Sequence, residues 1–181
     1  VELKMDGCGT AYVDTGIETV NRFWTRLATE AQMTLNIKCD GDLWIDEHHT
    51  AEDVAIAVGQ VLSQALRSKA GLNRMWSSTA SVGDATVEVT MDLSNRPYFE
   101  HDLRMEEYET EKVGDVSFEM FEHVLDSLVV NARLTVHIME RTHSKDPSDL
   151  VDATAAAFGK ALYFCSSIDT RRAGATASSK G

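Results

Sequence analysis

Two adjacent histidines and a glutamate stand close together in the segment GDLWIDEHHTAEDVAIAVGQVL, residues 41–62. On a helix capped by Asp46, His48 and Glu52 are one turn apart on one face, and His49 points about 100° away. The motif could therefore offer two ligands to one metal ion and one ligand to another. Imidazole with carboxylate suits Mn, Zn, Fe or Ni without choosing among them. The spacing is also compatible with solvated histidines in an acidic loop, so it does not by itself identify a metal site.

The elements that position these residues are predicted from the spacing of apolar side chains. A period of three to four residues indicates helices, and alternation indicates strands. We expect a helix over residues 15–30 with Thr15 as its N-cap, and one over residues 46–67 with Gly71 as C-cap. Further helices are expected over residues 118–132 and 148–164. Strands are expected over residues 33–39, 43–45, 85–93 and 134–140.

Two segments of the first half resemble two segments of the second. MTLNI at 33–37 is similar to LTVHI at 134–138, and each follows an amphipathic helix. AVGQVL at 57–62 is similar to AFGKAL at 157–162, which places Gly59 and Gly159 100 positions apart. A duplicated α/β unit explains this pattern, and self-similarity of this kind is the signature of an internal repeat. The alternative is a chance likeness between two amphipathic helices.

Composition excludes some partners. The chain of 181 residues has a formal net charge of −12, which argues against nucleic acid, because binding to phosphates needs a basic surface. A small anion held by a few local cations remains compatible. No apolar run reaches the roughly 18 residues that span a bilayer, so we expect no membrane partner and a location in the cytoplasm or an organelle matrix. The three cysteines, Cys8, Cys39 and Cys165, are expected to be reduced.

Several motifs together resemble the imidazoleglycerol-phosphate dehydratase family. Residues 41–62 are similar to its first metal motif, and the other matches follow in order along the chain: TGI at 15–17, DLSNRPYF at 92–99, EKVGD at 111–115, TVHI at 135–138 and SSKG at 178–181. The resemblance implies an α+β fold made by tandem duplication of a two-layer half with a sheet and two helices, like domain 2 of ribosomal protein S5. We expect half-repeats at 1–93 and 94–170 and a phosphate-binding tail at 171–181. It also implies two Mn²⁺ ions per subunit and a homo-oligomeric cage of up to 24 subunits.

The same resemblance implies a phosphate site. Arg74 in GLNRMW and Arg96 in LSNRPY match two family arginines, and Ser178 and Lys180 match the serine and lysine of its C-terminal motif. Two guanidinium groups, an ammonium and a hydroxyl make a chemically sensible phosphate clamp. The alternative is that both arginines are ordinary surface cations and the tail is disordered.

The family's metal ligands are only partly kept. His48, His49 and Glu52 are present, and His123 matches a helix histidine, although it could instead be a core residue. Where the family has histidine, Arg22 stands on the helix that follows TGI.

The second His-His-x-x-Glu motif reads Ser148, Asp149 and Asp152. One inferred ligand set, His48, Glu52, His123 and Asp149, stays usable. The other would contain His49, Ser148, Asp152 and Arg22, whose guanidinium opposes cation binding. We therefore expect one Mn²⁺ site instead of two.

The implied reaction is the dehydration of imidazole glycerol phosphate to imidazole acetol phosphate in histidine biosynthesis. A base must remove a proton from carbon, and Glu52 and Asp152 are the carboxylates expected at the catalytic positions. Asp152 is one methylene shorter than glutamate, and a displacement near 1 Å can cost about 100-fold in rate. The alternatives are a catalytically impaired paralogue that keeps the fold, the assembly and the phosphate pocket as a structural or regulatory subunit, and a different reaction on a phosphorylated imidazole or sugar.

Overall fold

The structure is a computed structural model that describes residues 1–41, 47–172 and 174–175. Its smaller sheet has the strand order β1-β3-β2, formed by β1 (Glu2–Lys4), β2 (Ala11–Asp14) and β3 (Thr34–Lys38). β2 and β3 are parallel and are joined by helix α1 (Glu18–Glu30), whereas β1 pairs with β3 in the antiparallel sense. Helix α2 (Glu47–Ala65) follows this sheet.

The larger sheet contains the same arrangement with one more strand. Its order is β4-β5-β9-β6, formed by β4 (Met75–Val82), β5 (Ala85–Asp92), β6 (Tyr98–His101) and β9 (Thr135–Thr142). β6 and β9 are parallel with helix α3 (Phe118–Ala132) between them in the chain, and β5 is antiparallel to β9. Helix α4 (Pro147–Ser166) then covers β4 and β5. The short elements are η1 (Met105–Glu107), the pair β7 (Lys112–Val113) and β8 (Val116–Ser117), and η2 (Thr170–Arg172).

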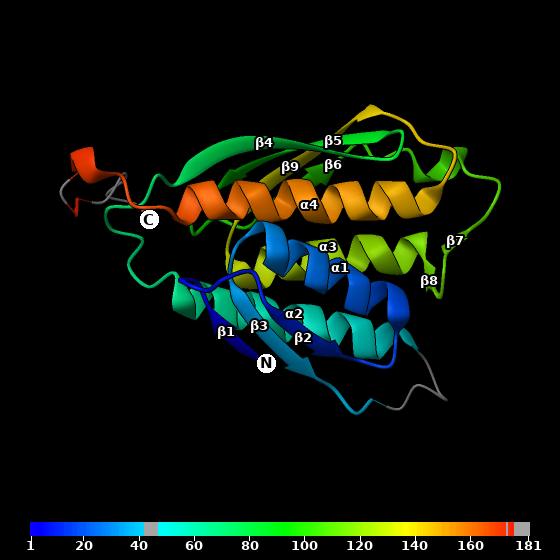
Figure 1. Ribbon diagram of the computed structural model, residues 1–181, viewed down its shortest axis with the longest axis horizontal. Helices are drawn as coiled ribbons and strands as arrows, with labels where there is room; N and C mark the ends of the chain where they lie inside the picture. Colours follow the sequence, from blue (N-terminus) through cyan, green and yellow to red (C-terminus); the bar gives the residue numbers. More distant parts are fainter. Residues whose placement is uncertain (42–46, 173, 176–181) are drawn as a thin grey trace.

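The helices lie between the two sheets and pack across the halves of the chain (Figure 1). α1 contacts α4, and α2 contacts α3. Each contact uses one glycine: a Cβ on Gly59 would lie 2.9 Å from the Leu128 carbonyl oxygen, and one on Gly159 would lie 2.5 Å from the Leu27 carbonyl oxygen. Close helix approach therefore requires glycine at both positions, because a side chain there would overlap the neighbouring backbone.

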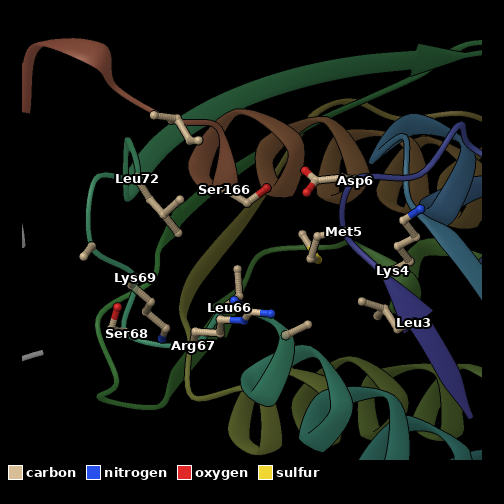
Figure 2. A pocket seen from close by; sticks show the side chains of 13 residues that line it. Leu3, Lys4, Met5, Asp6, Leu66, Arg67, Ser68, Lys69, Leu72 and Ser166 are labelled. Carbon is tan, nitrogen blue, oxygen red and sulfur yellow. The ribbon is translucent and has the colours of Figure 1, made fainter. Parts of the chain in front are cut away.

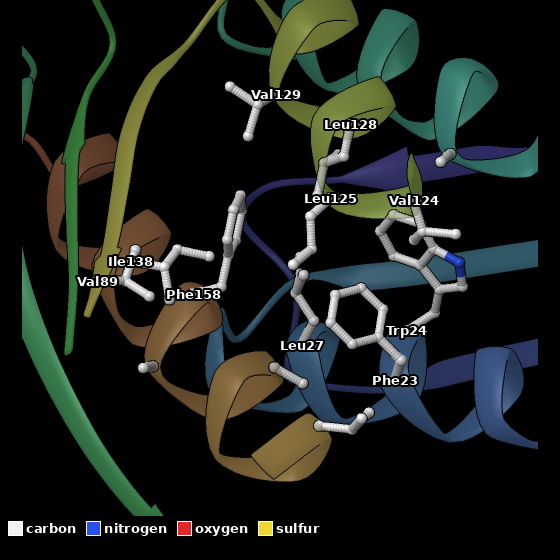
Figure 3. Close-up of a cluster of buried hydrophobic side chains, with 14 of the residues drawn as sticks. Phe23, Trp24, Leu27, Val89, Val124, Leu125, Leu128, Val129, Ile138 and Phe158 are labelled. Carbon is white, nitrogen blue, oxygen red and sulfur yellow. The ribbon is translucent and has the colours of Figure 1, made fainter. Parts of the chain in front are cut away.

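A single cluster of buried apolar side chains connects the two sheets with the helices between them (Figure 3). Phe158 of α4 lies between Val89 and Ile138 of the larger sheet and the apolar side chains of α1 and α3. Phe23 contacts Trp24 and Phe121 edge to face, with ring centroids 5.2 and 5.6 Å apart. These side chains are almost fully buried, which makes hydrophobic burial the main force that holds the helices to the sheets.

The start of α1 is stabilised from a distant part of the chain. The backbone N–H groups of Glu18 and Thr19 donate to the Asp115 carboxylate at 2.6 and 3.0 Å. Although burial raises the pKa of Asp115, the hydrogen bonds from Thr19 and Glu18 leave it below its ordinary value. The predicted N-cap Thr15 is wrong, since the N-cap residue is Ile17 and the Thr15 hydroxyl donates to Asn21 instead.

The predicted helices and strands are otherwise largely confirmed. α1, α2, α3, α4, β3, β5 and β9 lie within a few residues of the expected ranges. Gly71 is not the C-cap of α2, because the helix ends at Ala65. Residues 43–45 and Asp46 lie outside the described residues. β1, β2, β4 and β6 were not predicted, because they are short or, in β4, built mostly from small polar residues.

The structure also bears on the expected fold class, on the cysteines and on membrane-spanning helices. The α+β class is confirmed, and the three cysteines are free thiols. Among the described helices, none has the length and apolarity needed to cross a bilayer.

Candidate active site

The start of α2 places an imidazole next to an imidazole of α3. The ring centroids of His48 and His123 are 5.0 Å apart, and those of His48 and His49 are 6.4 Å apart. α2 and α3 pack side by side, and the His48–His123 pair lies at the end of this contact. His123 is exposed there, and Glu52 is half-buried. Two imidazoles with a carboxylate one helical turn away are a chemically reasonable donor set for a transition metal.

Asp149 does not join this pair within one chain. Its carboxylate accepts a hydrogen bond from the Ser144 hydroxyl at 2.7 Å and from the Asp84 backbone N–H at 3.4 Å, and it packs against Gly83 in the β4–β5 turn. In the part of the chain that the structure describes, no three His, Cys, Asp or Glu side chains are close enough together to share a metal ion. The expected set of His48, Glu52, His123 and Asp149 is therefore not assembled in one chain, and its role as a metal site stays a prediction.

An ion pair occupies the corresponding place between α1 and α4. Arg22 Nε lies 3.0 Å from Asp152 Oδ1. Asp152 Oδ1 is buried but accepts no hydrogen bond of good geometry. The contact with Arg22 is therefore an ion pair without a well-aligned hydrogen bond. Arg22 thus neutralises a carboxylate that was expected at a catalytic position, and Ser148 offers no imidazole beside it.

The two predicted phosphate-binding arginines lie at the same end of the larger sheet. Arg74 directly precedes β4 and has a left-handed backbone with φ of +75°. Its carbonyl oxygen accepts from the Leu93 N–H at 3.0 Å, which places it beside the loop that carries Arg96. Arg96 is exposed, and its backbone is held by the Ser94 hydroxyl, which accepts from the Arg96 N–H at 3.1 Å.

The guanidinium of Arg74 already has a carboxylate partner. Its Nε and Nη2 donate to the two oxygens of Asp92 at 2.7 and 3.3 Å. A guanidinium has five N–H donors, so Arg74 retains others for an anion. The predicted ligands Ser178 and Lys180 lie outside the described residues. The described part of the tail is anchored nearby, since the Gly71 N–H donates to the Ala175 carbonyl oxygen at 3.0 Å.

The imidazole pair and the arginines lie at opposite ends of α2. His48 is in its first turn, whereas Arg74 follows its last residue, Ala65, by a loop. At 1.5 Å per residue, the distance from His48 to Ala65 along the axis is about 25 Å. Figure 1 shows the start of α2 and the start of β4 at opposite ends of the molecule. A small phosphorylated imidazole is far shorter than this and cannot reach both groups of one chain.

One buried polar cluster was not predicted from the sequence. Glu140 lies on the inner face of β9, where its carboxylate accepts from the Arg104 backbone N–H at 2.7 Å and lies 2.6 Å from His143 Nδ1. Next to His143 lies Tyr108, whose pKa is raised to about 12 by burial and by the charges of Glu140 and Asp149. The alternation of Val136, Ile138 and Glu140 could have indicated an inward-facing glutamate.

Comparison with known proteins decides the family. A family profile described as imidazoleglycerol-phosphate dehydratase matches residues 15–162. The chain is 38% identical over 181 residues to the imidazoleglycerol-phosphate dehydratase of Prochlorococcus marinus (strain MIT 9313), covering all of this chain and 85% of that protein. The chain belongs to the imidazoleglycerol-phosphate dehydratase family. The resemblance inferred from the motifs is therefore confirmed.

Other relatives of the imidazoleglycerol-phosphate dehydratase family extend this comparison. The chain is 36% identical to the chloroplastic enzyme of Pisum sativum and spans 63% of that protein's length. A crystal structure of the imidazoleglycerol-phosphate dehydratase from Staphylococcus aureus subsp. aureus N315 matches with a TM-score of 0.82 and 27% identity over 92% of each chain. The Pyrococcus furiosus structure, in complex with (S)-C348, matches with a TM-score of 0.75 at 21% identity, which bears on the fold alone.

Proposed function

We propose that this chain is a carbon–oxygen hydro-lyase that dehydrates imidazole glycerol phosphate to imidazole acetol phosphate in histidine biosynthesis. The observation that carries the proposal is the His48–His123 contact, because it brings together imidazoles from two helices 75 positions apart in the sequence. The family match over most of the chain supports the substrate class. Arg74, Arg96, Ser178 and Lys180 are proposed to hold the phosphate.

The proposed metal is Mn²⁺, with His48, His49, Glu52, His123 and Asp149 as its candidate ligands. Bound Mn²⁺ would supply a Lewis acid that holds and polarises the imidazole ring. The residues of this chain would do the remaining work: the arginines orient the phosphate, and Glu52 or Asp152 accepts the proton removed from carbon.

We further propose one Mn²⁺ site per chain. Gly59 and Gly159 pack against residues of α3 and α1 that are 101 positions apart, Leu128 and Leu27. The contact between α1 and α4 therefore corresponds to that between α2 and α3. In this correspondence Arg22 takes the place of His123. A guanidinium paired with Asp152 does not fit a second metal position, because it brings a fixed positive charge to the place of the ion.

The matched packing also supports tandem duplication. The unit would be a sheet with two helices, as in domain 2 of ribosomal protein S5, with half-repeats at 1–93 and 94–170 and a tail at 171–181. The repeated pairing of β2 with β3 and of β6 with β9, each parallel around a helix, supports the duplication itself.

The separation along α2 supports the proposal of a homo-oligomer. Since about 25 Å of α2, from His48 to Ala65, separates the imidazole pair from the loop that leads to Arg74, a substrate that uses both groups needs the arginines of another copy. The family resemblance suggests a cage of up to 24 subunits, in the cytoplasm or an organelle matrix.

The Arg22–Asp152 pair also favours a second candidate, a catalytically impaired paralogue that keeps the fold, the assembly and the phosphate pocket. To separate the two, the purified chain is metal-depleted, reloaded with Mn²⁺ and assayed for imidazole acetol phosphate, with metal per chain measured by mass spectrometry. Product formation above that of an Arg96→Gln control supports the hydro-lyase. Retained binding of inorganic phosphate with no product supports the paralogue. Two ions per chain would contradict the single site.

A further inference from the structure

A cavity outside the proposed active site lies between the N-terminal strand and the end of α2. Its volume is about 640 Å³, within the range of small-molecule sites. Three segments far apart in the sequence form its wall: β1 and the residues after it, the end of α2 with the loop after it, and the end of α4 with Ile168 beyond it (Figure 2). Half of its lining is apolar, including Leu3, Leu66 and Leu72.

The charges on this wall are unlike those of the whole protein. Lys4, Arg67 and Lys69 contribute three cations and Asp6 a single carboxylate, in a chain whose net charge is −12. Figure 2 shows Arg67 and Lys69 on the side of the loop after α2, with Asp6 across the cavity beside Ser166. The loop side of the cavity therefore presents positive charge that the wall itself does not balance.

Lys69 is the most unusual of these cations because it is buried, with 9% of its surface exposed. Its ammonium donates to the neutral Asn95 Oδ1 at 2.6 Å. Among the described residues, no carboxylate lies within ion-pair distance of it, and the nearby Asp92 is already paired with Arg74. Buried lysines are rare unless they are paired, so this ammonium lacks the counter-charge that burial normally demands.

The backbone of the loop holds the two cations in place at a conformational cost. Arg67 and Lys69 have φ of +49° and +56°, although neither is glycine. Residues with a side chain are disfavoured in the left-handed region, and where they occur there they are often found at ligand clamps. The Lys69 N–H donates to the Leu66 carbonyl oxygen at 3.0 Å, which fixes the loop against the end of α2.

We propose that this cavity binds a small organic anion, a carboxylate or phosphate with an apolar body, whose charge is held by Arg67 and Lys69 and whose body packs on Leu3, Leu66 and Leu72. A guanidinium fork beside an ammonium matches either headgroup. The apolar lining excludes a fully hydrated inorganic ion as the best occupant. Neither Arg74 nor Arg96 lines this cavity, although the Lys69 ammonium points toward their loop through its hydrogen bond to Asn95. The proposal does not depend on dehydratase activity.

The test uses bromine-labelled probes on the full chain. Crystals are soaked in 4-bromobenzoate, in 4-bromophenyl phosphate and in the neutral 4-bromobenzamide, and the bromine is located by anomalous scattering. Affinities are measured by calorimetry. We expect bromine in the cavity for one or both anions. Comparing the benzoate with the phenyl phosphate shows whether the site prefers a carboxylate or a phosphate. The benzamide should bind at least tenfold more weakly, because a charge-assisted hydrogen bond contributes about 1.5–3 kcal/mol.

Two variants and a matched control complete the test. Arg67 is exposed, so Arg67→Gln should fold normally and weaken anion binding at least tenfold. Lys69→Met should do the same, with its fold checked by circular dichroism. Lys145→Gln removes one exposed positive charge elsewhere and should leave the affinity unchanged. Equal binding of the benzamide and the anions, bromine found only outside the cavity, or unchanged affinity in Arg67→Gln would each overturn the proposal.

Discussion

Arg22 and Asp152 form an ion pair, with Nε 3.0 Å from Oδ1, between the two helices that correspond to those carrying His123 and Glu52. The two matched helix contacts, each between one helix of the first half and one of the second, thus carry opposite chemistry. α2 and α3 present two imidazoles, whereas α1 and α4 present a guanidinium bound to a carboxylate. We therefore expect the α2–α3 contact to bind a cation more tightly than the α1–α4 contact, and the metal content per chain measures this difference.

Replacing Arg22 and Ser148 together by histidine should raise the Mn²⁺ content from about one to about two ions per chain. The change removes the fixed charge and restores imidazole donors beside Asp152. Metal per chain after dialysis, measured by mass spectrometry, checks this. Arg26→Gln, which removes a cation from the same helix at its Glu30 pair, should leave the content unchanged. An unaltered metal content in the double variant would mean that Arg22 is not what excludes the ion.

Gly159→Ala should lower the free energy of unfolding by about 1–3 kcal/mol, the range of overpacking substitutions. Alanine usually stabilises a helix relative to glycine by about 1 kcal/mol, so the sign of the effect is informative. The loss is expected because the new Cβ would lie 2.5 Å from the Leu27 carbonyl oxygen. Urea denaturation provides the measurement. Gly59→Ala, with its nearest backbone contact at 2.9 Å, should lose less, and a more stable Gly159→Ala would refute the close packing of α1 and α4.

Glu140→Gln should destabilise the fold by about 3 kcal/mol. The carboxylate is fully buried and is paired with His143 and with Arg104, whose Nη2 lies 3.5 Å away, and a hydrogen bond to a charged group contributes about 1.5–3 kcal/mol. Glu88→Gln is the matched control, because Glu88 pairs with Arg141 on the exposed face of the same sheet, where such pairs contribute at most about 1 kcal/mol. Equal losses in the two variants, measured by denaturant unfolding, would argue against a special role for the buried cluster.

Stability should rise with pH between about 8 and 10.5 through Lys69. Burial, followed by the charge of Arg133, lowers the pKa of this lysine from 10.5 to about 8, although Asp92 partly opposes the shift. In this window the unfolded chain binds a proton that the folded chain does not, so raising the pH favours folding. Lys69→Met should lose this part of the pH dependence. Identical unfolding profiles of the variant and the parent chain from pH 7.5 to 10.5 would show that the ammonium is not perturbed by burial.

The sequence alone determined the elements whose patterns are local and the family to which the chain belongs. Apolar spacing predicted α3 at the observed residues, because each helix buries one stripe of side chains and the period of that stripe is fixed by helix geometry. The ordered motifs around His48 and Arg96 were sufficient for the family assignment that comparison confirmed. Gly59 and Gly159, 100 positions apart in similar segments, identify the two matched helices from sequence alone.

Only the tertiary structure decided which residues meet. Asp115 caps α1 from 97 positions away, Glu140 gathers Arg104 and His143, and Lys69 reaches Asn95, none of which has a local sequence signal. The structure also separated two groups of predicted site residues, since α2 runs about 25 Å from His48 to Ala65 before the loop that leads to Arg74. The physical reason is that periodicity specifies which face of an element is buried, whereas packing specifies what lies opposite that face.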